Sequence, residues 1–332
     1  MTGVSVVVPT LGRPSLTALL TALAAGDAAP GPVEFLVVDD RRDAAGELPV
    51  PPGLDAKVLR GPAAGPAAAR NAGWRAARHE WVAFLDDDVL PDAGWLRGLH
   101  EDLAGAGPDV GGVQGDLRVP LPADRAPTDW ERVTAALADG AWITADMAYR
   151  RSALLATGGF DERLPRAFRE DAELAYRVRE AGFALVKGAR TVTHPVRPEN
   201  RWVSVRTQRG NADDALLRHL YGPAWRTRLE IPPGRRRRHV TVTAVAALAV
   251  ALAATAVRTR RRVPAVAAVA AGALWAAGTA EFAAARIGPG PRTRDEVVTM
   301  ALTSAVIPPV ATVHWLRGLL RWRGARPVGS PR

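Results

Sequence analysis

The chain contains no cysteine in its 332 residues. This absence excludes disulfides, thiolate-bound zinc and cysteine nucleophiles, and it is compatible with a reducing compartment. Residues 1–10 also lack the basic segment and the long apolar run of a secretory signal peptide. We therefore expect residues 4–8 to form the first strand of a folded domain.

Acidic residues are scarce in the last third of the chain. Residues 231–332 contain 16 lysines and arginines but 3 aspartates and glutamates, whereas residues 1–230 contain 28 and 31. The net charge of +10 therefore comes entirely from the last third. A uniformly basic nucleic-acid-binding protein would not show this division. Basic residues beside apolar runs indicate anionic lipid headgroups, so we expect membrane lipids, and not nucleic acid, as partners.

Three uncharged stretches in the last third are long enough to form membrane helices. They cover residues 240–257, 263–280 and 297–316. The first would be about 27 Å long as a helix, close to the hydrocarbon thickness of about 30 Å. Arginine clusters bracket the first two stretches, which favours a membrane-associated hairpin, and the third could span or lie in the interface. A soluble, alanine-rich helical subdomain is the alternative, and the positive-inside rule leaves the orientation open.

Residues 1–230 alternate short apolar segments with amphipathic ones. The pattern predicts strands over residues 4–8, 35–38, 81–85, 110–119 and 142–149, and helices over 15–25, 63–78, 91–105 and 171–181. Such alternation is typical of an α/β domain with a mainly parallel, Rossmann-like sheet covered by helices on both faces. Ligands bind such sheets at the carboxyl ends of the strands. We therefore expect a catalytic domain over 1–230 and a membrane-associated helical region over 231–332.

Three consecutive aspartates, Asp86, Asp87 and Asp88, follow the apolar segment 81–85. Adjacent carboxylates at the end of a buried strand repel one another unless a cation or hydrogen-bond donors offset their charge. In an extended backbone, Asp86 and Asp88 would point to one side and Asp87 to the other. Two carboxylates on one side suit Mg²⁺ or Mn²⁺ bridging a diphosphate, and a solvated acidic turn is the alternative.

Other strand ends and a small-residue segment carry polar side chains. Asp39 and Asp40 follow the segment 35–38, where a carboxylate accepts a hydrogen bond from a base or a ribose, or caps a turn. Arg70 lies among small residues that would let a helix approach a nucleotide closely. It can offset phosphate charge, although a solvated arginine on a helix face fits the sequence equally well.

Asp171 lies at the start of the helix predicted over 171–181. The helix dipole favours the ionised form there, as a general base for a hydroxyl nucleophile requires, and helix capping is the alternative. His194 follows an extended segment and is a candidate metal ligand, although a lone histidine is more often structural. The pair Gly158–Gly159 fits a tight turn or a close approach to a ligand.

Taken together, six ordered motifs resemble those of the family 2 glycosyltransferases of GT-A fold. They are Val-Val-Val-Pro-Thr (6–10), Val-Val-Asp-Asp (37–40), Ala-Arg-Asn (69–71), Leu-Asp-Asp-Asp (85–88), Gly-Gly-Phe-Asp-Glu (158–162) and Glu-Asp (170–171). The order and spacing match over residues 3–220, about two-thirds of the chain. The resemblance implies a mixed, Rossmann-like nucleotide-binding sheet flanked by helices.

The resemblance also implies an inverting, metal-dependent transfer from a nucleoside-diphosphate sugar. We expect the acceptor to be a hydroxyl of a lipid-linked or cell-envelope glycan, and the enzyme to lie at the cell membrane with its catalytic domain in the cytoplasm. By this resemblance, the nucleoside would be bound by Pro9, Thr10, Asp39 and Asp40, and Arg70 would lie near the nucleotide. Mg²⁺ or Mn²⁺ would be bound by Asp86, Asp88 and His194. Asp87 would support the donor sugar, and Asp171 would be the catalytic base.

Two departures from the family pattern leave the identity of the donor and of the acceptor open. Arg41 and Arg42 stand where a Gly-Ser pair is usual, and Asp146 stands where asparagine is common. The Gln-X-X-Arg-Trp signature of processive synthases is missing, which favours a single-addition transferase. A sugar nucleotidyltransferase is a rival reading, but the first strand is followed by no glycine-rich basic loop. A non-catalytic membrane scaffold is the other rival, against which the three carboxylates at Asp86, Asp88 and Asp171 argue.

Overall fold

A mixed β-sheet forms the centre of the molecule. The structure is a computed structural model, and it describes residues 2–328. Within them the sheet has eight strands in the order β3-β2-β1-β4-β7-β6-β8-β5. The strands are β1 (Val4–Thr10), β2 (Val33–Asp39), β3 (Ala56–Arg60), β4 (Trp81–Leu85), β5 (Leu90–Pro91), β6 (Val110–Arg118), β7 (Asp146–Arg150) and β8 (Ala184–Thr193).

Strand direction brings the expected ligand-binding ends together. Strands β3, β2, β1 and β4 run parallel to one another, so their carboxyl ends lie at one edge of the sheet. Strand β7 runs antiparallel to both β4 and β6, while β8 is parallel to β6. Strands β6 and β8 therefore run in the same direction as β1 to β4, and the prediction of a mainly parallel sheet is confirmed, with β7 and β5 as the antiparallel strands.

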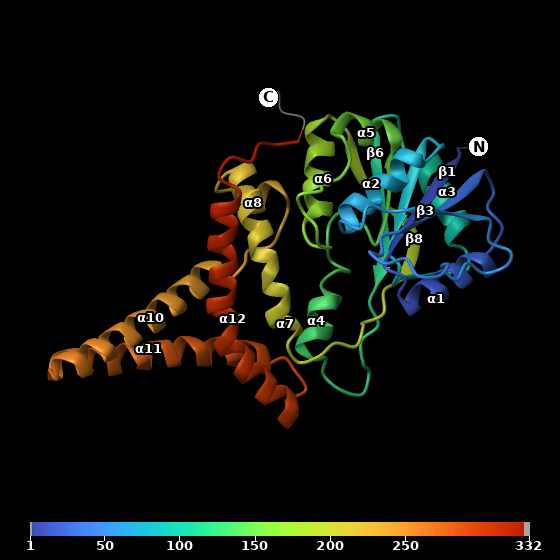
Figure 1. Cartoon of the computed structure of the whole chain (residues 1–332). Helices are drawn as coiled ribbons and strands as arrows, with labels where there is room; N and C mark the ends of the chain where they lie inside the picture. The colour runs from blue at the N-terminus through green and yellow to red at the C-terminus, as the bar shows by residue number, and fades with distance from the viewer. Residues whose placement is uncertain (1, 329–332) are drawn as a thin grey trace.

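Helices cover both faces of the sheet, as the alternating pattern predicts (Figure 1). On one face, α1 (Pro14–Ala25) and α3 (Trp95–Ala104) pack their leucines against the even-numbered valines of β1. On the other, α2 (Pro66–Ala76), α5 (Arg151–Thr157) and α6 (Glu170–Glu180) pack against Val7 and Phe84. The two cores hold the strand ends in fixed positions.

Small residues allow α2 to lie close to the sheet. A Cβ added at Gly73 would be 2.3 Å from a methyl group of Val7, so only glycine fits there. The pair Gly158–Gly159 has φ of +77° and +78°, and a Cβ at Gly159 would meet the side chains of Asn71 and Trp74 at 2.4 Å. The pair therefore makes the tight turn expected of it and packs against α2.

Helix α4 (Asp129–Ala135) lies between β6 and β7 in the chain. After β8, four helices connect the sheet to the last third: α7 (Val203–Arg206), the 3₁₀ helix η1 (Thr207–Gly210), α8 (Asn211–Tyr221) and α9 (Trp225–Arg228). Leucine and aromatic side chains of α8 and α9 form a third core with α6. The strand expected over 142–149 begins only at Asp146, because Trp142 has a positive φ of 64° and belongs to a turn.

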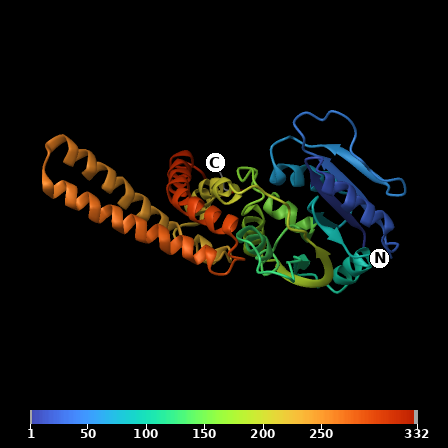
Figure 2. The ribbon, with the colours of Figure 1, turned by 90° about the horizontal axis from the view of Figure 1, so that it is seen from below.

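The last third forms three long helices: α10 (Arg236–Thr259), α11 (Arg262–Ile287) and α12 (Arg294–Arg321). All three are long and apolar enough to cross a membrane. Helices α10 and α11 form a hairpin that projects away from the sheet (Figures 1 and 2). In the apolar 18-residue stretch of each helix, 0% of the residues in α10 and 6% of those in α11 are buried, compared with 39% in α12.

Helix α12 packs along α8 and differs in this respect from the hairpin. A Cβ added at Gly318 would lie 2.7 Å from the carbonyl oxygen of Ala212, so the two helices touch through their backbones. The helix continues through Pro308 and Pro309, and Thr312 Oγ1 donates to the carbonyl of Pro308. Helix α12 is therefore held against the rest of the protein, unlike the hairpin.

Candidate functional site

The aspartate run begins where β4 ends and turns away from the strand. Residues 86–88 form a turn closed by the amide of Val89 donating to the carbonyl of Asp86. The extended geometry predicted for these residues is therefore wrong. Asp87 nevertheless points away from its neighbours, because its carboxylate accepts hydrogen bonds from Thr10 Oγ1 at 2.6 Å and from Arg13 at 2.8 Å.

Arg70 joins the aspartate turn to α6. Its guanidinium donates to Asp86 at 2.6 Å and to Glu170 at 2.8 Å, and it lies over the ring of Phe160. The side chain is almost fully buried, and its Nε has no hydrogen-bond partner among the described residues. The solvated arginine that the sequence also allowed is therefore wrong, and Arg70 is the central cation of the site.

Asp171 and Glu170 are neighbours with different surroundings. The Glu170 carboxylate is occupied by Arg70 and by the amide of Phe168, 2.6 Å away. Asp171 accepts, among residues 2–328, only the amide of Ala172 at 2.7 Å. Burial raises the pKa of Asp171, and it raises the pKa of Glu170 to about 7 with a further contribution from the charge of Asp171. Asp171 is thus the carboxylate of this pair that is free to accept a proton.

The preceding residue, Arg169, has a left-handed backbone with φ of 77°. A non-glycine residue in this region is strained, and such strain is concentrated at functional sites. Its side chain is held by Asp214 at 3.2 Å and stacks on Phe168. These contacts fix the start of α6, and with it the direction of Asp171.

Asp88 lies beside His194, as the predicted metal site requires. His194 Nε2 is 3.7 Å from Asp88, and the Nε of Arg197 is 3.0 Å from the same carboxylate. Burial raises the pKa of Asp88, and the charge of Asp86 raises it further. No group of three or more acidic, histidine or cysteine side chains within residues 2–328 is close enough to hold a metal alone.

The donor set at Asp88 fits a divalent cation that is shared with a ligand. Mg²⁺ is usually held by one or two carboxylates together with substrate phosphates, not by a complete protein cage. Asp88 and His194 offer such a partial set, whereas Asp86 is engaged by Arg70. The buried, destabilised charge of Asp88 is what a cation would offset.

Asp39 and Asp40 have different partners at the end of β2. Asp40 accepts the amides of Ala63 at 2.7 Å and Gly65 at 2.9 Å, so it caps the loop that leads into α2. Asp39 is gripped by the forked guanidinium of Arg41, which lowers the pKa of that carboxyl. The capping alternative therefore applies to Asp40, and Arg41 covers Asp39.

Asp146 has a structural partner. It is fully buried, accepts the indole N–H of Trp95 at 2.8 Å and pairs with Arg190 at 2.9 Å. Arg190 also pairs with Asp102. The departure from asparagine is therefore matched by a buried arginine, and it does not add a free carboxylate to the site.

Arg13 and Arg197 are functional candidates that the sequence pattern did not indicate. Each is half-exposed, and each donates to one aspartate of the run. Arg197 follows His194 by three residues and belongs to no sequence motif. Only the path of the chain after β8, which brings Arg197 to Asp88, identifies it as a candidate. Glu170, in contrast, was visible as half of the Glu-Asp motif.

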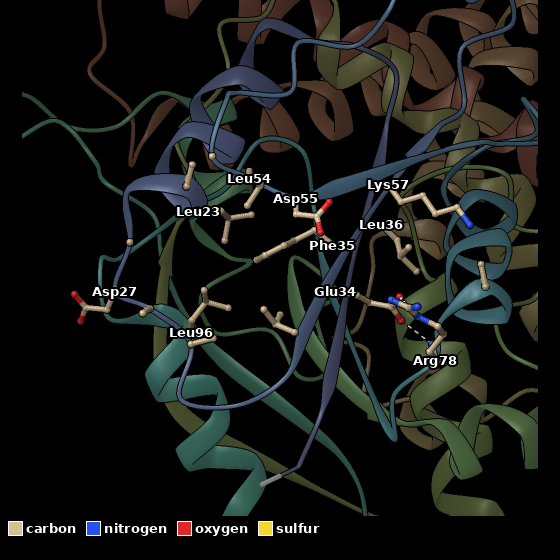
Figure 3. A pocket seen from close by; sticks show the side chains of 17 residues that line it. Leu23, Asp27, Glu34, Phe35, Leu36, Leu54, Asp55, Lys57, Arg78 and Leu96 are labelled. Atoms are coloured by element: carbon tan, nitrogen blue, oxygen red, sulfur yellow. Dashed lines mark hydrogen bonds and ion pairs between the residues drawn. The ribbon is translucent and has the colours of Figure 1, made fainter.

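A separate cavity of about 420 Å³ lies at the opposite end of the sheet (Figure 3). It is lined by the amino-terminal ends of β2 and β3, with Glu34, Lys57 and Arg78 among its charged residues. The Glu34 carboxylate accepts from Arg78, as Figure 3 shows. None of the candidate site residues lines this cavity, so it is distinct from the candidate site.

Replacing Arg70 with methionine should lower the free energy of unfolding by about 3–5 kcal/mol, because it leaves the buried Glu170 charge without a partner. Chemical unfolding of the detergent-solubilised protein would measure the change. The matched control is Arg75→Met on the same helix, where the arginine is 54% exposed and pairs with exposed Glu162. There the expected loss is about 0–1 kcal/mol. Equal losses in the two variants would contradict the central place given to Arg70.

Comparison with known proteins agrees with this arrangement. Residues 5–132 match the model of the family described as Glycosyl transferase family 2. A pre-mycofactocin glycosyltransferase of Mycobacterium tuberculosis is 31% identical over 182 residues, which are 50% of this chain and 38% of the relative. The mannosyltransferase PcManGT from Pyrobaculum calidifontis, solved with GDP-Man and Mn²⁺, has a TM-score of 0.52 at 18% identity and covers 97% of this chain and 88% of its own.

These matches agree with the fold described above. The fold is GT-A, a mixed sheet flanked by helices, followed by three apolar helices that are compatible with membrane association. The resemblance to family 2 glycosyltransferases is confirmed, with the family match covering residues 5–132. The chain spans 38% of the length of the Mycobacterium relative.

Proposed function

We propose that the protein is an inverting glycosyltransferase that moves a sugar from a nucleoside-diphosphate sugar to a hydroxyl of a lipid-linked or cell-envelope glycan. The observation that carries this proposal is the ionic link from Asp86 through Arg70 to Glu170, which places the aspartate turn beside Asp171. It joins the end of β4, where a donor diphosphate would bind, to the start of α6, where a base is free.

In the proposed reaction, the acceptor oxygen attacks the anomeric carbon from the face opposite the leaving group. The bond from that carbon to the diphosphate oxygen breaks, and nucleoside diphosphate leaves with inversion. Asp171 receives the proton of the acceptor hydroxyl, for which its half-buried position and raised pKa make it a better base than an exposed aspartate. Thr10 and Asp39 would contact the nucleoside, with Pro9 beside them and Asp40 holding the adjoining loop.

The proposed cation site consists of Asp88 and His194, with Asp86 nearby. A bound Mg²⁺ or Mn²⁺ would supply positive charge to the leaving diphosphate. Arg197, which now pairs with Asp88, and Arg70 supply the remaining positive charge around the turn. Asp87 orients Thr10 and Arg13 on the donor side of the turn.

We further propose that residues 1–230 form the catalytic domain and residues 231–332 the membrane-associated region. Each hairpin helix is long enough to cross, since 24 residues in α10 extend about 36 Å. If α10 and α11 both cross the membrane, the chain returns to the side on which α10 began. Helix α12 must lie on that side, because it packs against α8. The catalytic domain would then lie at the cytoplasmic face of the cell membrane, where the absence of cysteine is compatible with the reducing environment.

Nucleotide binding and donor hydrolysis by the full chain in detergent test the proposal. UDP and GDP would each be titrated calorimetrically with MnCl₂ or with EDTA, followed by UDP-sugars and GDP-sugars. GDP-mannose, bound with Mn²⁺ in the Pyrobaculum structure, is a rational first donor. We expect one nucleotide to bind more tightly with Mn²⁺, and its sugar to be released slowly together with nucleoside diphosphate.

Two other results would contradict the proposal in different ways. Release of pyrophosphate from a nucleoside triphosphate supplied together with a sugar 1-phosphate would indicate a sugar nucleotidyltransferase. Absence of both Mn²⁺-dependent binding and hydrolysis across the donor panel would indicate a non-catalytic scaffold of the same fold.

A further inference from the structure

Helix α4 lies between α12 and the sheet (Figure 1). It is short, and a complete capping box formed by Thr128 and Glu131 fixes its start. The segment before it, residues 119–128, forms no helix or strand. The position of α4 therefore depends on what its own side chains contact.

On the membrane side, α4 is held by Arg286 near the end of α11. This arginine is buried, with 8% of its surface exposed. It donates to the hydroxyls of Thr303 at 2.7 Å and Ser304 at 3.1 Å in α12, and to the carboxylate of Asp129 at 2.7 Å. One guanidinium thus joins α11, α12 and the first residue of α4.

Two additional contacts reinforce this junction. Arg132 of α4 donates to the backbone carbonyl of Arg286 at 2.8 Å. The carboxylate of Glu296, in the first turn of α12, accepts the backbone amide of Asp129 at 2.8 Å. Since these bonds use both the backbone and the side chain of Asp129, any shift of α11 against α12 will move the start of α4.

On the other side, α4 holds the segment that follows β8. The indole N–H of Trp130 donates to the carbonyl oxygen of Arg197 at 2.9 Å. The side chain of the same Arg197 donates to Asp88, the carboxylate beside His194. Residues 194–200 have no helix or strand of their own, so their position depends on such anchoring contacts.

We propose that Arg286 and Asp129 form a positioning pair, through which the membrane-associated helices and Trp130 hold the 194–197 segment against Asp88. The path runs from α11 to α4 and from α4 to Arg197, and each step is a hydrogen bond or an ion pair. Its consequence for donor binding rests on the proposed function. Neither residue touches the reacting atoms, so both act only through the placement of Arg197 and His194.

Hydrogen–deuterium exchange of the full chain in detergent tests the path without a ligand. Trp130→Phe removes the indole N–H that holds Arg197 and keeps an aromatic side chain, so the fold should persist. Exchange would be followed in the peptide that covers residues 195–201 and the flanking amides of His194 and Val203, which donate to the carbonyls of Arg118 and Asn200. It should be roughly three- to tenfold faster, as the loss of one hydrogen bond implies. Asp129→Asn should produce the same change in this segment, although it lies one step closer to the membrane helices.

Glu281→Gln is the matched control. Glu281 pairs with Arg235 and Arg238 between α10 and α11, and neither partner belongs to α4. Its replacement should leave exchange of residues 195–201 unchanged. The double variant D129N/W130F should exchange no faster than the faster single variant, because both substitutions break one path.

Calorimetric titration of UDP and GDP with MnCl₂ supplies the second measurement. Both single variants should weaken the Mn²⁺-dependent binding roughly three- to tenfold, and Glu281→Gln should not. Unchanged exchange at 195–201 in Trp130→Phe, or a change confined to α4 in Asp129→Asn, would overturn the proposed path. If the wild-type protein binds neither nucleotide, the proposed function fails, and the exchange data alone still decide the path.

Discussion

Replacing Asp171 with asparagine should lower the rate of sugar transfer by about 10²–10⁴-fold, the usual contribution of a general base. The amide keeps the size of the side chain but cannot take the acceptor proton. Glu170 is unable to substitute, because Arg70 and the amide of Phe168 occupy its carboxylate. Single-turnover transfer from the identified donor would measure the loss, and calorimetry should find Mn²⁺-dependent nucleotide binding preserved.

The same substitution should not destabilise the fold. Burial raises the pKa of Asp171 in the folded state, so the folded state binds its proton more tightly than the unfolded chain does. Above the unfolded pKa, stability therefore falls as pH rises until the folded pKa is passed, and the ionised carboxylate opposes folding at neutral pH. The thermal unfolding midpoint of Asp171→Asn at pH 7 should equal or exceed that of the wild type.

Glu180→Gln is a suitable control for Asp171→Asn, since Glu180 is an exposed carboxylate at the other end of α6. It should transfer sugar at the wild-type rate. Full turnover by Asp171→Asn would remove this residue from the mechanism. A loss of transfer accompanied by a lower unfolding midpoint would instead indicate that Asp171 acts as a structural cap.

Strands β1, β2 and β4 and their helices were predictable because local pattern and tertiary environment agree there. The apolar segments at β1, β2 and β4 are buried on both faces, and the glycines at 73 and 158–159 are required by contacts and turns. Strand β3, with its alternating partly exposed residues, and the two-residue β5 carry no comparable signal. Their pairing is decided by neighbouring strands and not by their own residues.

The sequence indicates residues of the candidate site but not the contacts among them. The sequence places Asp86, Arg70 and Glu170 far apart, and only the packing of α2 against β4 and α6 brings them into contact. Asp40 looked like a nucleotide ligand because it follows a strand, yet loop amides use its carboxylate. The choice among partners is made by tertiary structure, which motif spacing does not encode.

The third apolar helix shows the same limit in the membrane region. By length and composition α12 resembles α10 and α11, but 39% of the residues in its apolar 18-residue stretch are buried within the protein. The threonines, serine and glycine on its packed face were the available signal, since small residues permit close helix contact. Hydropathy alone does not separate a helix facing lipid from one facing protein.

Replacing Asp88 with asparagine should abolish the enhancement of nucleotide binding by Mn²⁺. Loss of residues that merely support a metal ligand costs about 10–100-fold in affinity, so loss of the ligand itself should weaken binding by about 100-fold or more. An amide oxygen carries no net charge and cannot offset the cation. Titrating MnCl₂ at fixed nucleotide, with EDTA as the zero point, would measure this directly.

Two variants separate a ligand role for Asp88 from a general effect of acidic charge. Asp116→Asn removes an exposed carboxylate from β6 and should leave Mn²⁺ dependence unchanged. Asp87→Asn should weaken nucleotide binding while retaining its Mn²⁺ dependence, because Asp87 faces Thr10 and Arg13. If Asp88→Asn kept its full response to Mn²⁺ and Asp87→Asn lost it, the ligand would be the aspartate that faces β1. The Asp88–His194 pair would then be a structural contact that Arg197 completes.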